Sequence, residues 1–265
     1  MRAPQAVLVA YRSPLWIKVA VGSFLAHFPD QHLLVVDNNP RHGERGWRPT
    51  CEEERAWLTA HPRVRLLPNE GPVRSHGRGM DLALAWCRDH GVETMLHIES
   101  DCHVRGVQWY RHLVAAVERG AAMAACHRKS WGPLHPCPSL WRVSEVRSSF
   151  DTDQRVDTTH PRFAELIDVE AFRRNSVALG ASETFFWDTG MRAWFDAAVE
   201  DRAVQVPGPD FAHYWKGSIN RQQHLHLFLD PRLLRYSRPP LRLWARVVGG
   251  RLLDAARRRG GSRHR

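Results

Sequence analysis

Short apolar runs alternate with amphipathic stretches along the first hundred residues. Residues 15–27 and 80–90 repeat apolar side chains every three to four positions, which predicts two helices. Apolar runs of strand length surround them, and the predicted strands are residues 6–11, 32–37, 63–67 and 93–98. Residues 71–79 predict a loop. Strands that alternate with helices form a mostly parallel sheet with helices on both faces, so we expect a single-domain α/β fold.

The pattern becomes less regular after residue 106. Helices are predicted at 107–120 and 189–200, and residues 207–213 predict a loop. Short strands are predicted at 121–126 and 203–206. Residues 129–161 are rich in Pro, Ser and Trp, which predicts a long functional loop, with disorder as the alternative.

The positive charge of the chain is concentrated at one end. The 265 residues have a formal net charge of +10, and residues 232–265 contain eleven arginines and one acidic residue, so this segment carries the whole excess. We therefore expect a neutral folded domain, residues 1–231, followed by a basic tail, residues 232–265. A nucleic-acid binder is expected to carry basic residues on its folded domain as well, so the charge pattern disfavours nucleic acid as a partner.

The composition of the tail indicates a candidate contact with a membrane surface. Residues 241–248 and 252–259 interleave arginine with apolar side chains, as a basic segment lying on anionic lipid does. A solvated tail is the alternative, because Gly249 and Gly250 interrupt any helix. The sequence has no run of about 18 apolar residues and no secretory-type leader. We expect a cytoplasmic protein, with peripheral contact at the inner membrane face as a role for the tail.

The cysteines predict reduced thiols. They are odd in number and contain no CxxC pair, which disfavours a disulfide framework and a standard structural zinc site. Cys126, His127, His135 and Cys137 match no ordinary zinc spacing.

Two acidic residues follow the predicted strand 93–98. Glu99 and Asp101 are two positions apart, so an extended chain projects both carboxylates to one side. A divalent cation that bridges two phosphates needs such oxygen ligands and open positions for the diphosphate. Asp151 and Asp153 have the same spacing but predict a turn, because no buried strand precedes them.

Two further polar positions suit a nucleotide site. Asp37 ends the strand 32–37, where a carboxylate accepts hydrogen bonds from a base or ribose, although closing an Asx-turn is the alternative. His213 is a candidate third metal ligand or diphosphate contact. Lys216 and Ser218 follow it closely and suit phosphate oxygens.

The order of these motifs resembles glycosyltransferase family 2 and its GT-A relatives over roughly residues 6–220. Residues 7–11 resemble the first strand of the family, and 35–38 resemble its nucleoside-binding strand end. Residues 99–101 resemble its DxD metal motif, with Glu99 in place of the usual first Asp. Residues 187–190 stand where its acidic ED motif falls, with Trp187 in place of the first acid.

The resemblance implies a GT-A type (Rossmann-like) catalytic domain, with a nucleotide-binding half at about 1–105 and an acceptor-side half at about 106–231. It implies a UDP- or other nucleotide-sugar donor, an unidentified acceptor (a small molecule, glycan or lipid-linked group), Mn²⁺ or Mg²⁺, and inversion at the anomeric carbon. The two departures leave the base and the stereochemistry open.

Asp188 is the candidate general base, with capping of the following helix as the alternative. Metal-ligand candidates are Glu99, Asp101 and His213; nucleotide-sugar candidates are Tyr11, Asp37, Asn38, Arg74, Glu99, Lys216 and Ser218.

Two other functions compete with sugar transfer. A nucleotidyltransferase would need the same metal and nucleotide contacts, but it usually has a Gly-rich, basic loop after the first strand, and residues 11–14 are a poor version of that loop. A non-catalytic protein that binds through its arginine-rich tail would ignore nucleotides. Among the eleven tryptophans, Trp131 and Trp141 lie in the predicted long loop and are the candidates for stacking on sugar.

Overall fold

A computed structural model describes residues 2–11, 14–178, 188–214 and 230–237. Within these residues, seven strands form one sheet in the order β3-β2-β1-β4-β7-β6-β8. The strands are β1 (Gln5–Ala10), β2 (Leu33–Asp37), β3 (Val64–Pro68), β4 (Thr94–Ile98), β6 (Met123–Ala125), β7 (Ser139–Arg142) and β8 (Ala203–Gln205). Only β7 runs antiparallel to its neighbours β4 and β6, and every other pair is parallel. The prediction of a mostly parallel α/β sheet is confirmed.

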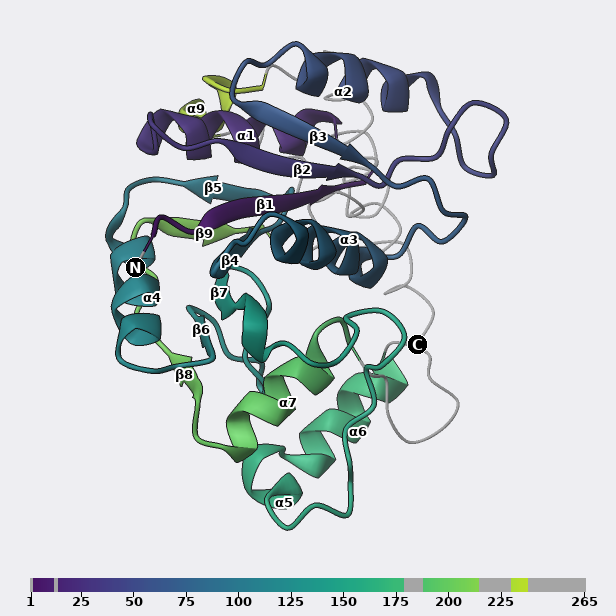
Figure 1. The fold of residues 1–265 in the computed structure, drawn as a ribbon. Helices are drawn as coiled ribbons and strands as arrows, with labels where there is room; N and C mark the ends of the chain where they lie inside the picture. Colours follow the sequence, from purple (N-terminus) through teal and green to yellow (C-terminus); the bar gives the residue numbers. More distant parts are fainter. Residues whose placement is uncertain (1, 12–13, 179–187, 215–229, 238–265) are drawn as a thin grey trace, which may run out of the picture.

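Helices cover both faces of this sheet (Figure 1). Helices α1 (Pro14–His27) and α2 (Pro49–Thr59) lie on one side, and α3 (His76–Asp89) lies on the other. The remaining described helices are α4 (Gln108–Glu118), the 3-10 helix η1 (Val143–Glu145), α5 (Phe163–Leu166), α6 (Val169–Ala178), α7 (Met191–Val199) and α9 (Pro231–Leu234). Helices α5, α6 and α7 gather near the β8 end of the sheet, on the same side as α3.

Strand β1 contributes to the two larger hydrophobic cores of the described residues, because its side chains alternate between the two faces of the sheet. Leu8 packs in the core that contains Phe24 of α1 and Trp109 of α4. Val7 and Val9 point the other way, into the core that contains Met80 of α3. A strand buried on both faces reads as a continuous apolar run, which is why this strand was predictable from sequence.

Helix α3 begins four residues before the prediction, so the expected loop at 71–79 is too long. Ser75 caps the helix, since its hydroxyl accepts a hydrogen bond from the Arg78 N–H at 3.0 Å. Gly79 lies inside the helix and faces β1, where an added Cβ would stand 2.5 Å from Val9 Cγ1. The glycine therefore permits close helix–sheet packing and is not a turn residue.

The segment predicted as one long loop, residues 129–161, contains part of the sheet. Strand β7 (Ser139–Arg142) lies between β4 and β6, and Leu140 and Trp141 are buried. The interpretation of 129–161 as loop throughout is wrong, because a short strand held by two neighbours needs no long apolar run of its own. The loop predicted at 207–213 likewise contains a strand, β9 (Phe211–His213).

The described chain remains packed beyond the predicted domain boundary at residue 231. Leu233 of α9 is buried against Trp16 and Val19 of α1. Residues 238–265, which hold most of the predicted basic tail, lie outside the described residues. In the described part of the chain, every helix is too short or too polar to span a membrane.

Candidate active site

The two acidic candidates lie at the carboxyl edge of the sheet. Glu99 follows β4, and Asp101 immediately precedes strand β5 (Cys102–Val104). Strand β9 pairs antiparallel with β5, with Cys102 opposite His213. This small second sheet brings His213 beside the acidic pair across more than one hundred residues of sequence.

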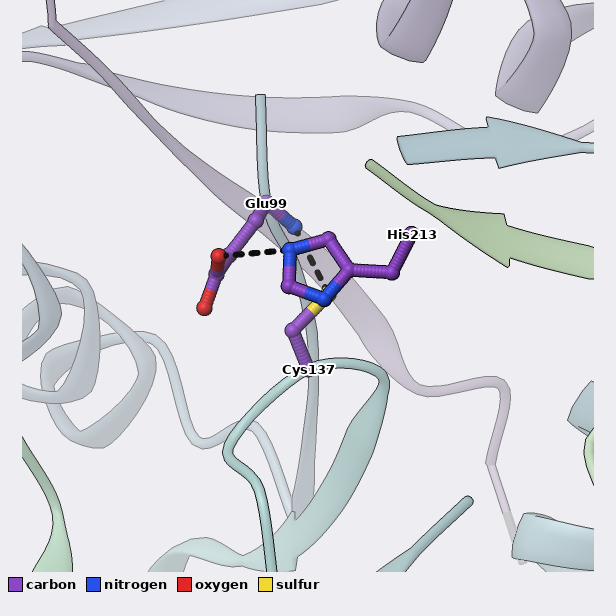
Figure 2. A group of neighbouring side chains, drawn as sticks. All are labelled: Glu99, Cys137 and His213. Atoms are coloured by element: carbon purple, nitrogen blue, oxygen red, sulfur yellow. Dashed lines mark hydrogen bonds and ion pairs between the residues drawn. The ribbon is translucent and has the colours of Figure 1, made fainter. Parts of the chain in front are cut away.

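The side chain of His213 contacts the carboxylates of both Glu99 and Asp101. His213 Nε2 lies 3.0 Å from Glu99 Oε2 and 3.1 Å from Asp101 Oδ1, and Figure 2 shows the contact with Glu99. The side chains of His213 and Asp101 are only 2% and 6% exposed, and that of Glu99 is 20% exposed. Burial disfavours the charged imidazole, but hydrogen bonds to both carboxylates outweigh it and raise the pKa of His213 to about 9.

The same three atoms suit a divalent cation. Neighbouring ligands of an octahedral ion with bonds of about 2.1 Å are separated by roughly 3.0 Å. The contacts of His213 with Glu99 and Asp101 already have this spacing. An ion here would take the place of the proton that the imidazole shares with the carboxylates. Glu99, Asp101 and His213 therefore suit Mn²⁺ or Mg²⁺ in chemistry, and each carboxylate has this spacing from His213 Nε2. Among the described residues, however, the donor atoms that all lie within 4.8 Å of one another belong to Glu99, His213 and Cys137, and Asp101 is not one of them.

Cys137 adds a fourth donor that sequence reasoning did not assign to this site. Its sulfur, a Glu99 carboxylate oxygen and a His213 ring nitrogen all lie within 4.8 Å of one another (Figure 2). The Glu99 N–H donates a hydrogen bond to Cys137 Sγ at 3.1 Å. Cys137 lies just before β7, so the missed strand explains why the sequence did not place this thiol at the edge of β4.

A cavity of about 490 Å³ opens beside this cluster. It lies between the carboxyl edge of the sheet, the segment before β7, helix α6, and the residues just before α7. Its lining residues are His76, Glu99, Arg128, Lys129, Ser130, Trp131, His135, Pro136, Asn175, Asp188, Thr189 and His213. Three sequence candidates, Glu99, Asp188 and His213, thus face one space, whereas Lys129, His135 and His76 are lining residues that sequence reasoning missed.

Asp188 forms an ion pair with Lys129 inside this cavity. Its side chain is 42% exposed and that of Lys129 is 14% exposed. Burial opposes ionisation of Asp188, but the Lys129 ammonium outweighs it and holds the pKa of Asp188 below its ordinary value. Helix α7 starts at Met191 with Gly190 as its N-cap, so Asp188 does not occupy the N-cap position. Asp188 Oδ1 accepts a hydrogen bond from the Thr189 N–H at 2.8 Å.

Asp37 and Asn38 lie in a buried polar network at the ends of β2 and β3. Asp37 Oδ2 accepts from Arg55 Nε at 2.5 Å, and Asp37 Oδ1 accepts from the Asn39 N–H at 3.2 Å. Asn38 donates to the Ser75 carbonyl at 2.8 Å and accepts from Asn69 Nδ2 at 2.6 Å. Both side chains thus already make the hydrogen bonds that hold these two loops together.

This network yields a stability prediction. Replacing Arg55 with alanine leaves the Asp37 carboxylate, 1% exposed, without its ion-pair partner. We expect Arg55→Ala to lower the free energy of unfolding by about 3 to 5 kcal/mol in urea denaturation. Arg174→Ala is the control, because Arg174 pairs with Glu170 at an exposed surface and should cost about 1 kcal/mol or less. Equal, small effects of both substitutions would contradict this interpretation.

The other sequence candidates have varied positions. Arg74 donates to both carboxylate oxygens of Glu44 at 2.9 Å, on the loops beyond β2 and β3. Tyr11 is half-buried directly after β1. Lys216 and Ser218 lie outside the described residues. Trp131 lines the cavity but is 3% exposed and stacks on Phe172, and Trp141 is in the core.

Comparison with known proteins gives similarity of fold only. No protein-family model and no curated protein matches the chain. Similar solved structures include 4-diphosphocytidyl-2C-methyl-D-erythritol synthase, at 11% identity over 89% of this chain and 99% of that one, with a TM-score of 0.48. TarS 1-349 of S. aureus has 11% identity over 86% and 66% of the two chains, with a TM-score of 0.45. The bifunctional IspDF of Campylobacter jejuni has 9% identity over 62% and 47%, with a TM-score of 0.38. Likeness at this level does not identify the chemistry, which has to be argued from the site.

Proposed function

We propose that this chain is a metal-dependent glycosyltransferase, which transfers a sugar from a nucleotide diphosphate-sugar donor to an acceptor hydroxyl. The observation that carries the proposal is the approach of His213 Nε2 to within 3.0 Å of Glu99 and 3.1 Å of Asp101. Glu99 and His213 line a cavity at the carboxyl edge of a mostly parallel sheet, which is where ligands of such sheets bind.

We assign metal binding, phosphate contact and proton acceptance to different residues around the cavity. A cation held by Glu99, Asp101 and His213 would neutralise charge on the departing nucleoside diphosphate. Arg128 and Lys129 line the same cavity and add positive charge for phosphate oxygens. Asp188 lines the same cavity as an ionised carboxylate, so it can accept the proton of the acceptor hydroxyl as the oxygen bonds to the anomeric carbon, although its ion pair with Lys129 lowers its affinity for that proton.

The donor-contact roles of the remaining candidates stay predictions. Asp37, Asn38 and Arg74 make hydrogen bonds within the protein, so a nucleotide would contact them at the edge of an existing network. The donor contact of Tyr11, which follows β1 directly and is half-buried, also remains a prediction. The membrane contact predicted for the tail concerns residues beyond Ser237, which lie outside the described residues.

A binding panel tests the donor class. The full chain is heated with UDP-, GDP- and dTDP-sugars, each with Mn²⁺ and with a chelator. We expect one nucleotide class to raise the Tm, and only when the metal is present, because an unscreened diphosphate is repelled by two carboxylates. Stabilisation that is equal in the chelator, or absent with every donor, would contradict the proposal.

Product analysis then separates sugar transfer from the runner-up. A glycosyltransferase releases the nucleoside diphosphate, whereas a nucleotidyltransferase attacks phosphorus and releases pyrophosphate. Pyrophosphate as the product would replace our proposal with nucleotidyl transfer at the same cation site. A domain that binds no nucleotide would favour a protein acting through its tail.

A further inference from the structure

We propose that Cys137 is a ligand of the cation site, so that the site selects a thiophilic ion such as Zn²⁺ or Co²⁺ over Mg²⁺. This inference rests on the metal site of the proposed function and narrows the identity of its ion. Carboxylate oxygens alone suit Mg²⁺, whereas a thiolate beside imidazole and carboxylate suits zinc-like ions.

The positions of the donor atoms support this ligand set. The Cys137 sulfur lies within 4.8 Å of both a Glu99 oxygen and a His213 nitrogen. Zn–S bonds of about 2.3 Å and Zn–N or Zn–O bonds of about 2.0 to 2.2 Å place the donor atoms around a tetrahedral ion roughly 3.5 Å apart. The contact of Glu99 with His213 is already shorter than this, and the Cys137 sulfur would have to approach those two atoms by up to about 1.3 Å to share one metal with them. Figure 2 shows the three side chains converging.

The backbone beside Cys137 supplies a hydrogen-bond donor to its sulfur. Cys137 is fully buried, and the Glu99 N–H points at its sulfur with a distance of 3.1 Å. Backbone N–H groups that donate to a ligand atom are a common second layer of support in metal sites. Without an ion, burial and the neighbouring Glu99 raise the pKa of the Cys137 thiol well above its ordinary value. On metal binding, the thiol would release its proton to solvent and its sulfur would bond the ion.

Cys126 provides a matched control. It is also a buried thiol, 6% exposed, and its sulfur lies 3.9 Å from the Pro207 carbonyl oxygen. It is not a member of the donor cluster found among the described residues. A serine at either position keeps the size and offers a hydroxyl, so the two variants differ mainly in whether a metal ligand is lost.

Cobalt titration of the metal-free full-length protein tests the inference. The wild-type protein and Cys126→Ser should develop a near-ultraviolet thiolate-to-cobalt charge-transfer band as Co²⁺ binds. Cys137→Ser should lack the band and bind Co²⁺ at least about tenfold more weakly, while its affinity for Mg²⁺ changes by less than about threefold. X-ray absorption of the zinc-loaded wild-type protein needs no variant, and it should show a sulfur neighbour at about 2.3 Å.

The outcomes separate this inference from the proposed function. If Co²⁺ binds without the band and binding is lost in His213→Ala, the cation site stands and the role of Cys137 is refuted. If Co²⁺ binding is absent, or is unaffected by both His213→Ala and Cys137→Ser, the metal site of the proposed function is refuted as well. A zinc spectrum with only nitrogen and oxygen neighbours would also overturn the inference.

Discussion

Asp188→Asn is expected to lower kcat by about 10²- to 10⁴-fold, while the fold and the affinity for the sugar donor stay close to wild type. Asparagine keeps the shape of aspartate and can still accept the hydrogen bond from the Thr189 N–H. It cannot accept a proton from the acceptor hydroxyl, and it loses the ion pair with Lys129. Steady-state kinetics with saturating donor and acceptor, together with calorimetric donor binding, measure the two effects separately.

Asp196→Asn is the control for this prediction. Asp196 lies on α7 and pairs with Arg192 on the same helix, and it does not line the cavity. The control should keep the wild-type kcat. If Asp188→Asn transfers sugar within a few-fold of the wild-type rate, Asp188 is not the base.

Asp101→Asn is expected to weaken metal-dependent binding of the donor nucleotide by at least tenfold, and by up to about 100-fold. The amide cannot supply the negative charge that attracts the ion. The fold should persist, because the Tyr214 N–H still donates to the backbone carbonyl of residue 101, and asparagine Oδ1 can still accept from His213 Nε2. Calorimetry with the nucleoside diphosphate in Mn²⁺ measures the loss directly.

Asp153→Asn is the matched control for Asp101→Asn. Asp153 belongs to an acid-x-acid triplet of the same spacing, but it is exposed and follows no buried strand. The Asp153→Asn variant should bind the nucleotide as tightly as the wild-type protein does. Equal binding by Asp101→Asn and the wild-type protein would mean that Asp101 is not a ligand.

The central part of the fold was predictable because its strands are buried on both faces. Strands β1, β2 and β4 are continuous apolar runs, and their observed bounds agree with the predicted ones to within one residue. Strand β7 was missed because its four residues follow a Pro-rich stretch and are stabilised by two neighbouring strands. Helix α2 gave no usable signal, because its run of glutamates leaves few apolar positions.

Some residues of the candidate site were likewise predictable from local sequence, and others depend on contacts between distant segments. Glu99 and Asp101 became candidates because they follow a predicted strand, which local sequence can reveal. The contact of His213 with both depends on the β5–β9 pairing, and that pairing cannot be read from spacing. Asp37 looked like a ligand contact at a strand end, yet the structure pairs it with Arg55 from α2, a helix that was not predicted. The positions of Lys129 and Cys137 at the site depend on the fold of the chain around β7, a strand that the sequence did not predict.

We propose above all that Glu99, Asp101 and His213 hold a divalent cation that binds the donor diphosphate. The most direct measurement is an anomalous difference map from a crystal of the full chain grown with Mn²⁺ and the nucleoside diphosphate selected by the binding panel. We expect one strong manganese peak within bonding distance of the Glu99 and Asp101 carboxylates and of His213 Nε2, in contact with the diphosphate oxygens. A map with clear nucleotide density and no manganese at these three side chains would contradict it.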